Sequence, residues 1–333
     1  MKCVVIYFSL TGNTELVARA VQVGVQQAAG NCDIFPIKEA NPKGLRGYDL
    51  IGFGFPVMAE FSLVNVTDFI NDMVFVGGKH IFQFNTADSG NVSPHILPKF
   101  RSRGLTVIGY RAWRGANYGP LAEPTPGFGD GHPDEIDLLE AEAFGREMVW
   151  NSQKIYAGDT SLIPGDPPER RPISAQGSQQ EQAMHLPTSL AETKKMMHWR
   201  LIYDKEKCLY PKCTLCMDFC PMYGIDLTMT PPVIGNPCMT CMMCDQLCPT
   251  GAIAVDEAQM HWQEERHASG NGYTDRLEWR KNFPRNYVPK EKIIQGWTDV
   301  TYKTYPKHPR FVIGLGRPYG IDPRTGWKEI QED

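Results

Sequence analysis

The sequence predicts an α/β protein with a five-stranded, doubly wound parallel sheet, followed by a small α+β module and an irregular, aromatic-rich tail. Three observations lead to this prediction. Short apolar segments alternate with helix-length segments along residues 1–157, as they do in parallel sheets covered on both faces. Eight of the ten cysteines lie between Cys208 and Cys248. The tail, residues 257–333, holds four of the seven tryptophans, whereas disordered chains are poor in aromatic residues.

The first predicted elements are a strand, a polar loop and a helix. An apolar run at residues 4–8 predicts a buried strand, and apolar residues at helical spacing from Thr14 onward predict a helix. Between them the loop SLTGNT, which begins at Ser9, places hydroxyl groups at a helix N-terminus, where free N–H groups favour a phosphate. The loop lacks the lysine of a triphosphate loop and the glycines of a dinucleotide loop. A monophosphate fits it better, and helix capping without a ligand is the alternative.

The rest of the predicted sheet follows from four further apolar segments, at residues 33–37, 49–54, 80–85 and 105–110. Helix-length segments separate them, which predicts parallel strands joined by crossover helices. Ligands of such sheets bind at the carboxyl ends of the strands, near the point where the strand order reverses. The loops after the third and fourth strands, FPVMAEF from Phe55 and NTADSG from Asn85, are therefore expected at the site.

This half of the chain resembles the flavodoxins, whose first loop binds the phosphate of FMN through the same pattern of hydroxyl groups. The matching positions are Val5, Tyr7, Ser9, Gly12, Thr14, Ala18 and Val21. The resemblance implies FMN as cofactor, with its phosphate held by Ser9, Thr11, Gly12, Asn13 and Thr14. It also implies that the flavin ring is flanked by Pro56, Val57 and Met58 and approached at its polar edge by Thr86, Ala87 and Gly90.

The last part of this half is expected to pack near the same edge. Trp113 is expected either to cover the flavin or to pack at the surface. A final helix is predicted to begin at HPDEIDLLEAEAFG, with Pro133 in its first turn. Its core-facing stripe is predicted to consist of Ile136, Leu139 and Ala143.

The cysteines form two runs, CLYPKCTLCMDFCP from Cys208 and CMTCMMCDQLCP from Cys238. A dense group of cysteines in a reducing compartment predicts metal binding before disulfides. Short spacings let a tightly turning chain present three sulfurs to one face of an iron–sulfur cube, and the fourth sulfur must come from elsewhere. Structural zinc is the alternative, but it uses cysteine pairs separated by longer spacers.

The two runs resemble those of bacterial two-cluster ferredoxins, in which the last cysteine of each run ligates the other cluster. The resemblance implies two 4Fe-4S clusters and a short strand after each run, at residues 225–227 and 252–255. The implied ligands of one cluster are Cys208, Cys213, Cys216 and Cys248, and those of the other are Cys238, Cys241, Cys244 and Cys220. The chain departs from the pattern in having four residues, LYPK, between its first two cysteines.

Composition divides the chain into four expected segments: a flavodoxin-like domain at 1–157, a Pro/Gly/Gln-rich linker at 158–198, a ferredoxin domain at 199–256 and an extension at 257–333. Its length of 333 residues agrees with more than one domain. No segment approaches the roughly 20 apolar residues of a membrane helix, and the N-terminus lacks signal-peptide features. We therefore expect a cytoplasmic protein without a membrane span or a nucleic-acid partner.

The whole chain resembles the fused flavodoxin–ferredoxin proteins of anaerobic bacteria and archaea. The resemblance implies a low-potential electron carrier that relays electrons between FMN and two 4Fe-4S clusters, to or from a partner oxidoreductase. One alternative is an FMN-dependent reductase of a quinone, nitro compound or enone, fed by its own clusters. Another is a permanent subunit of a larger redox complex. The extension is expected to pack on its own domains, dock to a partner or join two copies of the chain.

Overall fold

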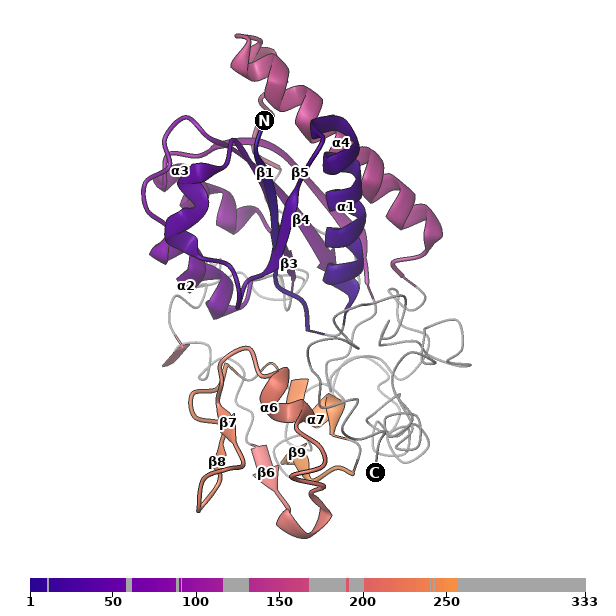
Figure 1. Ribbon diagram of the computed structural model, residues 1–333, viewed down its shortest axis with the longest axis vertical. Helices are drawn as coiled ribbons and strands as arrows, with labels where there is room; N and C mark the ends of the chain where they lie inside the picture. The colour runs from indigo at the N-terminus through magenta and orange to yellow at the C-terminus, as the bar shows by residue number, and fades with distance from the viewer. Residues whose placement is uncertain are drawn as a thin grey trace, which may run out of the picture. The chain divides into compact units, whose positions relative to one another are not determined.

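The computed structural model describes residues 1–10, 12–57, 62–87, 90, 92–115, 132–167, 190–191, 201–239, 241, 243–248 and 250–256. The chain divides into two compact units, which are described separately (Figure 1). The first contains a five-stranded sheet with its helices, and the second contains the cysteine runs. Among the helices in these ranges, none combines the length and the apolar character needed to span a membrane.

The sheet of the first unit confirms the predicted five-stranded, doubly wound arrangement. Its strands are all parallel, in the order β2-β1-β3-β4-β5. They are β1 (Cys3–Tyr7), β2 (Asp33–Pro36), β3 (Leu50–Pro56), β4 (His80–Ala87) and β5 (Thr106–Arg114). Because β1 is flanked by β2 on one side and β3 on the other, the strand order reverses there, and this is where such sheets bind ligands.

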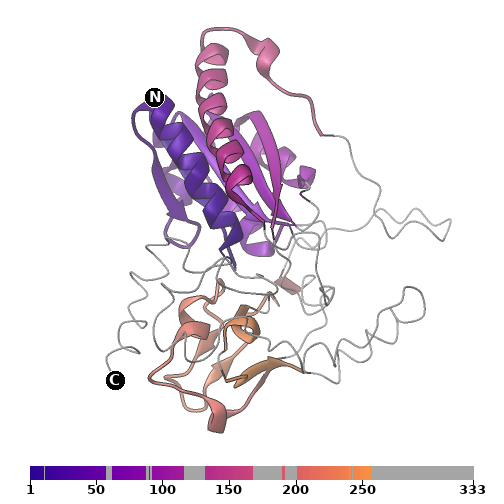
Figure 2. The same cartoon turned by 90° about the vertical axis from the view of Figure 1, so that its right-hand side faces the viewer.

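Helices cover both faces of this sheet. One face carries α1 (Asn13–Ala29) and α4 (Glu135–Tyr156), and the other carries α2 (Val64–Asp72) and α3 (Leu97–Ser102) (Figures 1 and 2). Shorter 3-10 turns are η1 (Pro42–Gly47), η2 (Pro94–Ile96) and η3 (Thr160–Leu162). Both layers are needed because a parallel sheet of mostly apolar strands has no face that is suited to water.

Phenylalanines fill both interfaces between the sheet and its helices. Phe53 of β3 packs against Phe69 of α2 and Phe100 of α3, with ring centroids 5.7 and 5.4 Å apart. Phe82 of β4 points to the opposite face and meets Phe144 of α4 edge-on at 5.6 Å. Edge-to-face rings at these distances add to the stabilisation that comes from burial alone.

Two glycines allow α1 and α4 to approach each other closely. A Cβ atom on Gly24 of α1 would overlap the carbonyl oxygen of Glu142, and one on Gly145 of α4 would overlap that of Val21. Backbone atoms cannot rotate away as a side chain can, so a larger residue at either position must separate the helices. Helix α4 is therefore held against the sheet and against α1 at once.

The structure corrects the predicted start and core face of the last helix. Pro133 precedes the N-cap residue Asp134, and α4 begins at Glu135. Ile136 and Leu139 are 68% and 65% exposed, and Ala143 is exposed as well. The face that packs on the sheet is formed by Ala141, Phe144, Gly145, Met148, Val149, Ser152 and Ile155. The predicted stripe lies on another face of the helix, because the packed face is set by Phe144 and by the close approach of Gly145 to α1.

The second unit contains two small antiparallel sheets. One pairs β6 (Leu201–Tyr203) with β9 (Ile253–Val255), and the other pairs β7 (Ile225–Asp226) with β8 (Val233–Ile234). The remaining elements are η5 (Lys205–Lys207), α6 (Leu215–Asp218) and α7 (Met243–Leu247). The short strands expected after each cysteine run are confirmed as β7 and β9.

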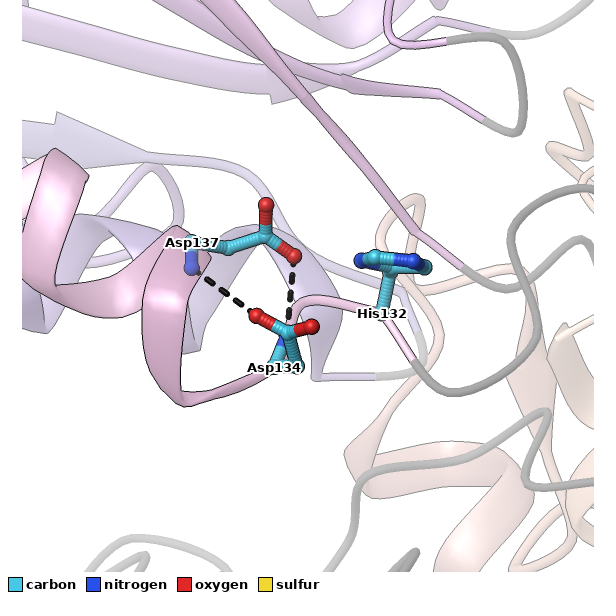
Figure 3. Close-up of side chains that lie close together, drawn as sticks. All are labelled: His132, Asp134 and Asp137. Atoms are coloured by element: carbon cyan, nitrogen blue, oxygen red, sulfur yellow. Dashed lines mark hydrogen bonds between the residues drawn. The ribbon is translucent and has the colours of Figure 1, made fainter.

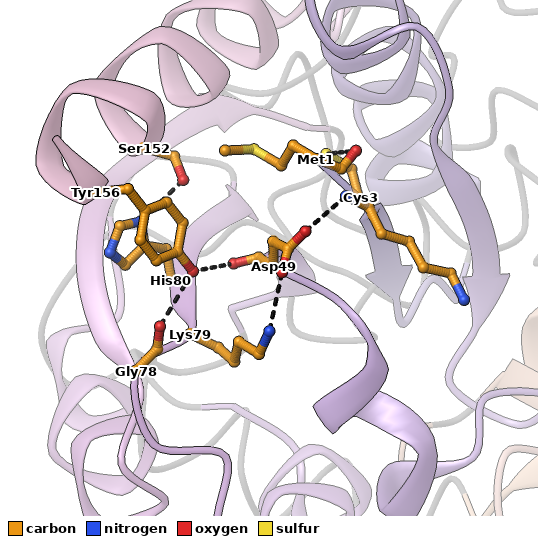
Figure 4. A network of polar contacts seen from close by, with 9 residues as sticks. Met1, Cys3, Asp49, Gly78, Lys79, His80, Ser152 and Tyr156 are labelled. Atoms are coloured by element: carbon orange, nitrogen blue, oxygen red, sulfur yellow. Dashed lines mark hydrogen bonds and ion pairs between the residues drawn. The ribbon is translucent and has the colours of Figure 1, made fainter.

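A polar network closes the end of the sheet opposite to the carboxyl ends of the strands (Figure 4). The ring of His80 is 4% exposed, stacks on Tyr156 at 3.9 Å and has its Nδ1 atom 2.8 Å from Ser152 Oγ. The Tyr156 hydroxyl donates to the carbonyl oxygens of Asp49 and Gly78. Burial lowers the pKa of His80, because the charged imidazolium loses hydration there.

Acid should weaken the first unit through His80. Its pKa in the folded chain lies below the ordinary value of 6.5, so the unfolded chain binds more protons just below that pH. Stability is complete above pH 6.5 and falls as the pH drops from there toward the folded-state pKa. Replacing His80 by Gln should flatten this slope in thermal unfolding measured between pH 5 and 8. Replacing the exposed His95 by Gln should leave the slope unchanged, and an equal flattening by both changes would contradict the assignment.

Gly145→Ala should destabilise the first unit although alanine is the better helix former. The helical preference favours alanine by about 1 kcal/mol, whereas overpacking against a backbone carbonyl typically costs about 1 to 3 kcal/mol. We expect a lower midpoint in urea unfolding followed by circular dichroism. Gly47→Ala is the control, since a Cβ atom there meets nothing within 4 Å. A higher midpoint for Gly145→Ala would show that the helices separate without cost.

Candidate functional site

The first candidate site lies at the carboxyl ends of the strands, where the loop after β1 leads into α1. Gly12 adopts a φ of 100°, in the left-handed region that favours glycine, and the chain then turns into the helix at Asn13. Asn13 and Thr14 are buried, with 5% and 1% of their surface exposed, and Ser9 is half-buried. Thr11 lies outside the described residues. The loop thus combines polar side chains with a helix N-terminus, whose dipole favours an anion.

Hydrogen bonds join this loop and the end of β3 to the end of β4. The Oγ1 atoms of Thr14 and Thr86 are 2.7 Å apart, and both residues are buried. The amide of Val57 donates to the carbonyl oxygen of Thr86 at 2.9 Å. The end of β4 is therefore bonded both to the start of α1, through Thr14, and to the end of β3, through Val57.

The loop residues predicted to face the ring occupy the ends of β3 and β4. Pro56 is the last residue of β3 and, like Val57, is half-buried, whereas Ala87 is buried at the end of β4. A tight turn follows, in which the amide of Gly90 donates to the carbonyl oxygen of Ala87 at 3.1 Å and Gly90 has a φ of 66°. Met58 lies outside the described residues.

The predicted place of Trp113 is wrong. Its side chain is only 3% exposed and meets Phe144 edge-on at 5.7 Å, within the core between the sheet and α4. The side chain of Arg111 pairs with Glu140 at 3.0 Å. The alternation of β5 directs Trp113 into the core, which a short sequence pattern at the end of a strand did not indicate.

A group of buried polar residues beside this site was not predicted from the sequence. Gln83, Asn85 and Ser93 are each at most 1% exposed and are hydrogen-bonded to one another. The signal was present in IFQFNTA, where polar residues alternate with phenylalanines in a strand that is buried along its whole length. Buried amides in such a strand require hydrogen-bond partners.

The second candidate site is a pair of cavities in the cysteine-rich unit. The first cavity is lined by Cys208, Cys213, Cys216 and Cys248, together with aliphatic residues. The second is lined by Cys220, Cys238, Cys241 and Cys244, with three methionines, Met222, Met239 and Met243. Each cavity thus gathers three cysteines of one run and the last cysteine of the other run.

The two runs build their cavities in the same way. Cys216 lies in the short helix α6 and Cys244 lies in α7. The sulfur of the last cysteine in each run accepts an amide hydrogen from the residue four positions later, Gly224 N to Cys220 Sγ at 3.2 Å and Ala252 N to Cys248 Sγ at 3.1 Å. The two cysteine runs therefore share the same local structure.

Four of the thiols in these cavities have a pKa that is raised by burial. Burial raises the pKa of Cys213 to about 11 and that of Cys241 to about 12. Burial also raises the pKa of Cys216 and Cys244, and nearby thiols add to the effect. Thiolates are the metal-binding form of cysteine, and a bound cation stabilises their negative charge. These cavities are therefore suited to a cation that binds sulfur.

A third group, His132, Asp134 and Asp137, has ligand-type atoms within 4.8 Å of one another (Figure 3). The two carboxylates already form the capping box of α4. Asp134 accepts hydrogen bonds from the amides of Ile136 and Asp137 at 2.9 and 3.0 Å, and Asp137 accepts one from the amide of Asp134 at 2.9 Å. These bonds account for the arrangement without a metal ion.

Comparison with known proteins assigns both halves of the chain. The flavodoxin domain family matches residues 4–103. An uncharacterized protein of Methanocaldococcus jannaschii is 26% identical over 45% of this chain and its own full length. A ferredoxin of Methanothermococcus thermolithotrophicus is 38% identical over 16% of this chain and 93% of its own length. The chain belongs to the ferredoxin family and also carries a flavodoxin domain. This flavodoxin–ferredoxin fusion joins two domain types that elsewhere occur as separate proteins.

Among solved structures, a flavodoxin from the domain Archaea aligns with 46% of the fusion and 99% of its own chain, at 19% identity and a TM-score of 0.36. The flavodoxin fold of the fusion rests on its own strand order and parallel registers, which are those of the flavodoxin-like sheet.

Proposed function

We propose that this protein is a low-potential electron carrier of the cytoplasm, which relays electrons between FMN and two 4Fe-4S clusters and exchanges them with a partner oxidoreductase in anaerobic metabolism. The general electron-transfer role follows from the flavodoxin and ferredoxin domains. The observation that carries the specific proposal is the gathering of four cysteines around each of two cavities, with one cysteine of each run crossing to the other cavity.

The cysteine cavities fit cubane clusters in number and kind of donor. Four sulfurs converge on each, and no second type of ligand is needed. We propose Cys208, Cys213, Cys216 and Cys248 as the ligands of one cluster and Cys238, Cys241, Cys244 and Cys220 as those of the other. Backbone amides that donate to Cys220 and Cys248 would stabilise negative charge on the sulfurs.

The carboxyl edge of the sheet fits FMN. The N-terminus of α1 and the buried polar side chains of Asn13 and Thr14 suit a phosphate dianion, which we propose is held by Ser9, Thr11, Gly12, Asn13 and Thr14. We propose that the ring lies between Pro56, Val57 and Met58 on one side and Thr86, Ala87 and Gly90 on the other. FMN exchanges one or two electrons and a cluster exchanges one, so their combination converts paired transfers into single ones.

Carrier function is favoured over reduction of an organic substrate because the tyrosine hydroxyl of β5 is already engaged. Tyr110 donates its hydroxyl hydrogen to the carbonyl oxygen of Gly165 at 2.9 Å, which fixes residues after α4 to β5. A reductase of quinones or enones needs a proton donor beside the ring.

Cofactor content tests the cluster assignment directly. Anaerobically purified protein should contain about eight iron and eight sulfide per chain, as two cubanes require, together with one FMN. Iron and acid-labile sulfide are measured chemically and FMN by release on denaturation. About four iron per chain would contradict the two-cluster assignment, and zinc in place of iron would contradict both clusters.

Electron transfer without substrate turnover tests the carrier role. The isolated protein, chemically reduced in the absence of oxygen, should pass electrons rapidly to one-electron acceptors such as a cytochrome, because its cofactors discharge one electron at a time. It should show no saturable reduction of a quinone, a nitro compound or an enone in stopped-flow measurements. Saturable turnover of any of the three would instead identify the protein as an FMN-dependent reductase.

A further inference from the structure

We propose that Asn85 is a positioning residue that couples the loops after β3 and β4, so that the two sides of the flavin-ring site are set together and not independently. The proposal rests on the FMN site proposed above and adds a residue that does not itself contact the ring. Asn85 lies near the end of β4, in register with Phe55 of β3.

The side chain of Asn85 bridges two backbone segments that are far apart in sequence. Its Nδ2 atom donates to the carbonyl oxygen of Phe55 at 3.1 Å, one residue before Pro56 and the loop that follows β3. Its Oδ1 atom accepts the amide hydrogen of Ser93 at 3.1 Å, at the far end of the loop that follows β4. A single planar amide thus fixes the distance between the carbonyl of Phe55, just before one loop, and the amide of Ser93, at the end of the other.

Gln83 completes the link from the same face of β4. Its Nε2 atom is 2.7 Å from both Asn85 Oδ1 and the carbonyl oxygen of Ser93. The amide and the carbonyl of Ser93 are therefore both bound by side chains of β4, much as a neighbouring strand would bind them. Ser93, which follows the loop after β4, is therefore attached to that same strand.

The burial of these groups makes the link strong. Gln83 and Asn85 are 0% exposed and Ser93 is 1% exposed, so water does not replace a bond that is broken. A buried donor or acceptor that loses its partner costs about 1 to 3 kcal/mol, which is more than a typical hydrogen bond contributes. Separating Ser93 from the end of β3 therefore requires these buried bonds to be broken.

Coupling also explains why amides occupy a strand that is otherwise apolar. Phe82 and Phe84 of β4 pack in the core shared with α4, and an apolar residue at position 83 or 85 would pack on the other face without a desolvation cost. The amides are useful at these positions because they reach the carbonyl of Phe55, just before the loop after β3, and the backbone of Ser93, at the end of the loop after β4. Thr86, the next residue, bonds the side-chain hydroxyl of Thr14, so β4 anchors the phosphate loop as well.

The test compares Asn85→Leu, Gln83→Met and a control, Ser152→Ala, in the full chain. Asn85→Leu keeps the branching and the number of side-chain heavy atoms and removes both bridging bonds, and Gln83→Met removes only the bonds to Ser93 O and Asn85. Ser152→Ala removes an equally buried hydrogen bond, to His80, at the opposite end of the sheet. The readouts are the dissociation constant of FMN, the FMN midpoint potential, hydrogen exchange at the Ser93 amide and the unfolding midpoint.

For Asn85→Leu we expect FMN to bind about tenfold more weakly, equivalent to about 1.4 kcal/mol, with a shifted midpoint potential and fast exchange at Ser93. Gln83→Met should cause a smaller change in the same direction, and it decides the question if Asn85→Leu does not fold. Ser152→Ala should lower the unfolding midpoint and leave FMN affinity and potential unchanged.

Failure of the Asn85 proposal and failure of the proposed function give different results. If Asn85→Leu and Gln83→Met lower stability as Ser152→Ala does while FMN affinity and potential stay at the wild-type values, the amides have only a structural role and the proposal is overturned. If the wild-type chain itself binds no FMN, the proposed function fails. Protection of the Ser93 amide, and its loss in Asn85→Leu, would then still establish or refute the link between the loops.

Discussion

The parallel arrangement of the five strands is the constraint on which the rest of the first unit depends. A parallel sheet must be covered on both faces, and the polypeptide meets this demand with helices that approach very closely. Gly24 and Gly145 remove the side chains that would separate α1 from α4, and Gly52 and Gly54 of β3 leave room for the rings of Phe82 and Phe84. Little of the two covered faces is left for binding, so a ligand site can form only where the strands end.

Beyond the carboxyl ends of the strands, the backbone of the loops is no longer held by the hydrogen bonds of the sheet. Other bonds must therefore position these loops. Strand β4 does this through side chains of alternate chemistry. Its phenylalanines enter the core, while Asn85 binds the carbonyl of Phe55 in β3 and the amide of Ser93, and Thr86 bonds the hydroxyl of Thr14. Each such bond lies in a region from which water is excluded, where a lost partner is expensive. Side chains of β4 thus specify the backbone at the end of β3 and at Ser93.

The cysteine-rich unit meets a different difficulty. Its apolar core is small, consisting of Ile225, Leu227, Cys244 and Ile253 with partly buried neighbours, and units of this size seldom fold by burial alone. Burial also keeps its thiols protonated, as the raised pKa of Cys213 shows. A metal cluster would resolve both difficulties, because it balances the charge of the thiolates and links distant segments by covalent bonds.

The sequence by itself determined the class of the fold, the five strands and the two groups of cysteines, since strand rhythm and cysteine spacing are local properties of the chain. It also placed the loop from Ser9 to Thr14, whose polar residues and helix start lie within six positions. Only the tertiary structure decided that Ile136 and Leu139 face outward, that Trp113 is in the core and that Asn85 joins two loops. These features depend on how closely helices approach and on which backbone atoms lie opposite one side chain, and such contacts between distant segments arise only when the chain has folded.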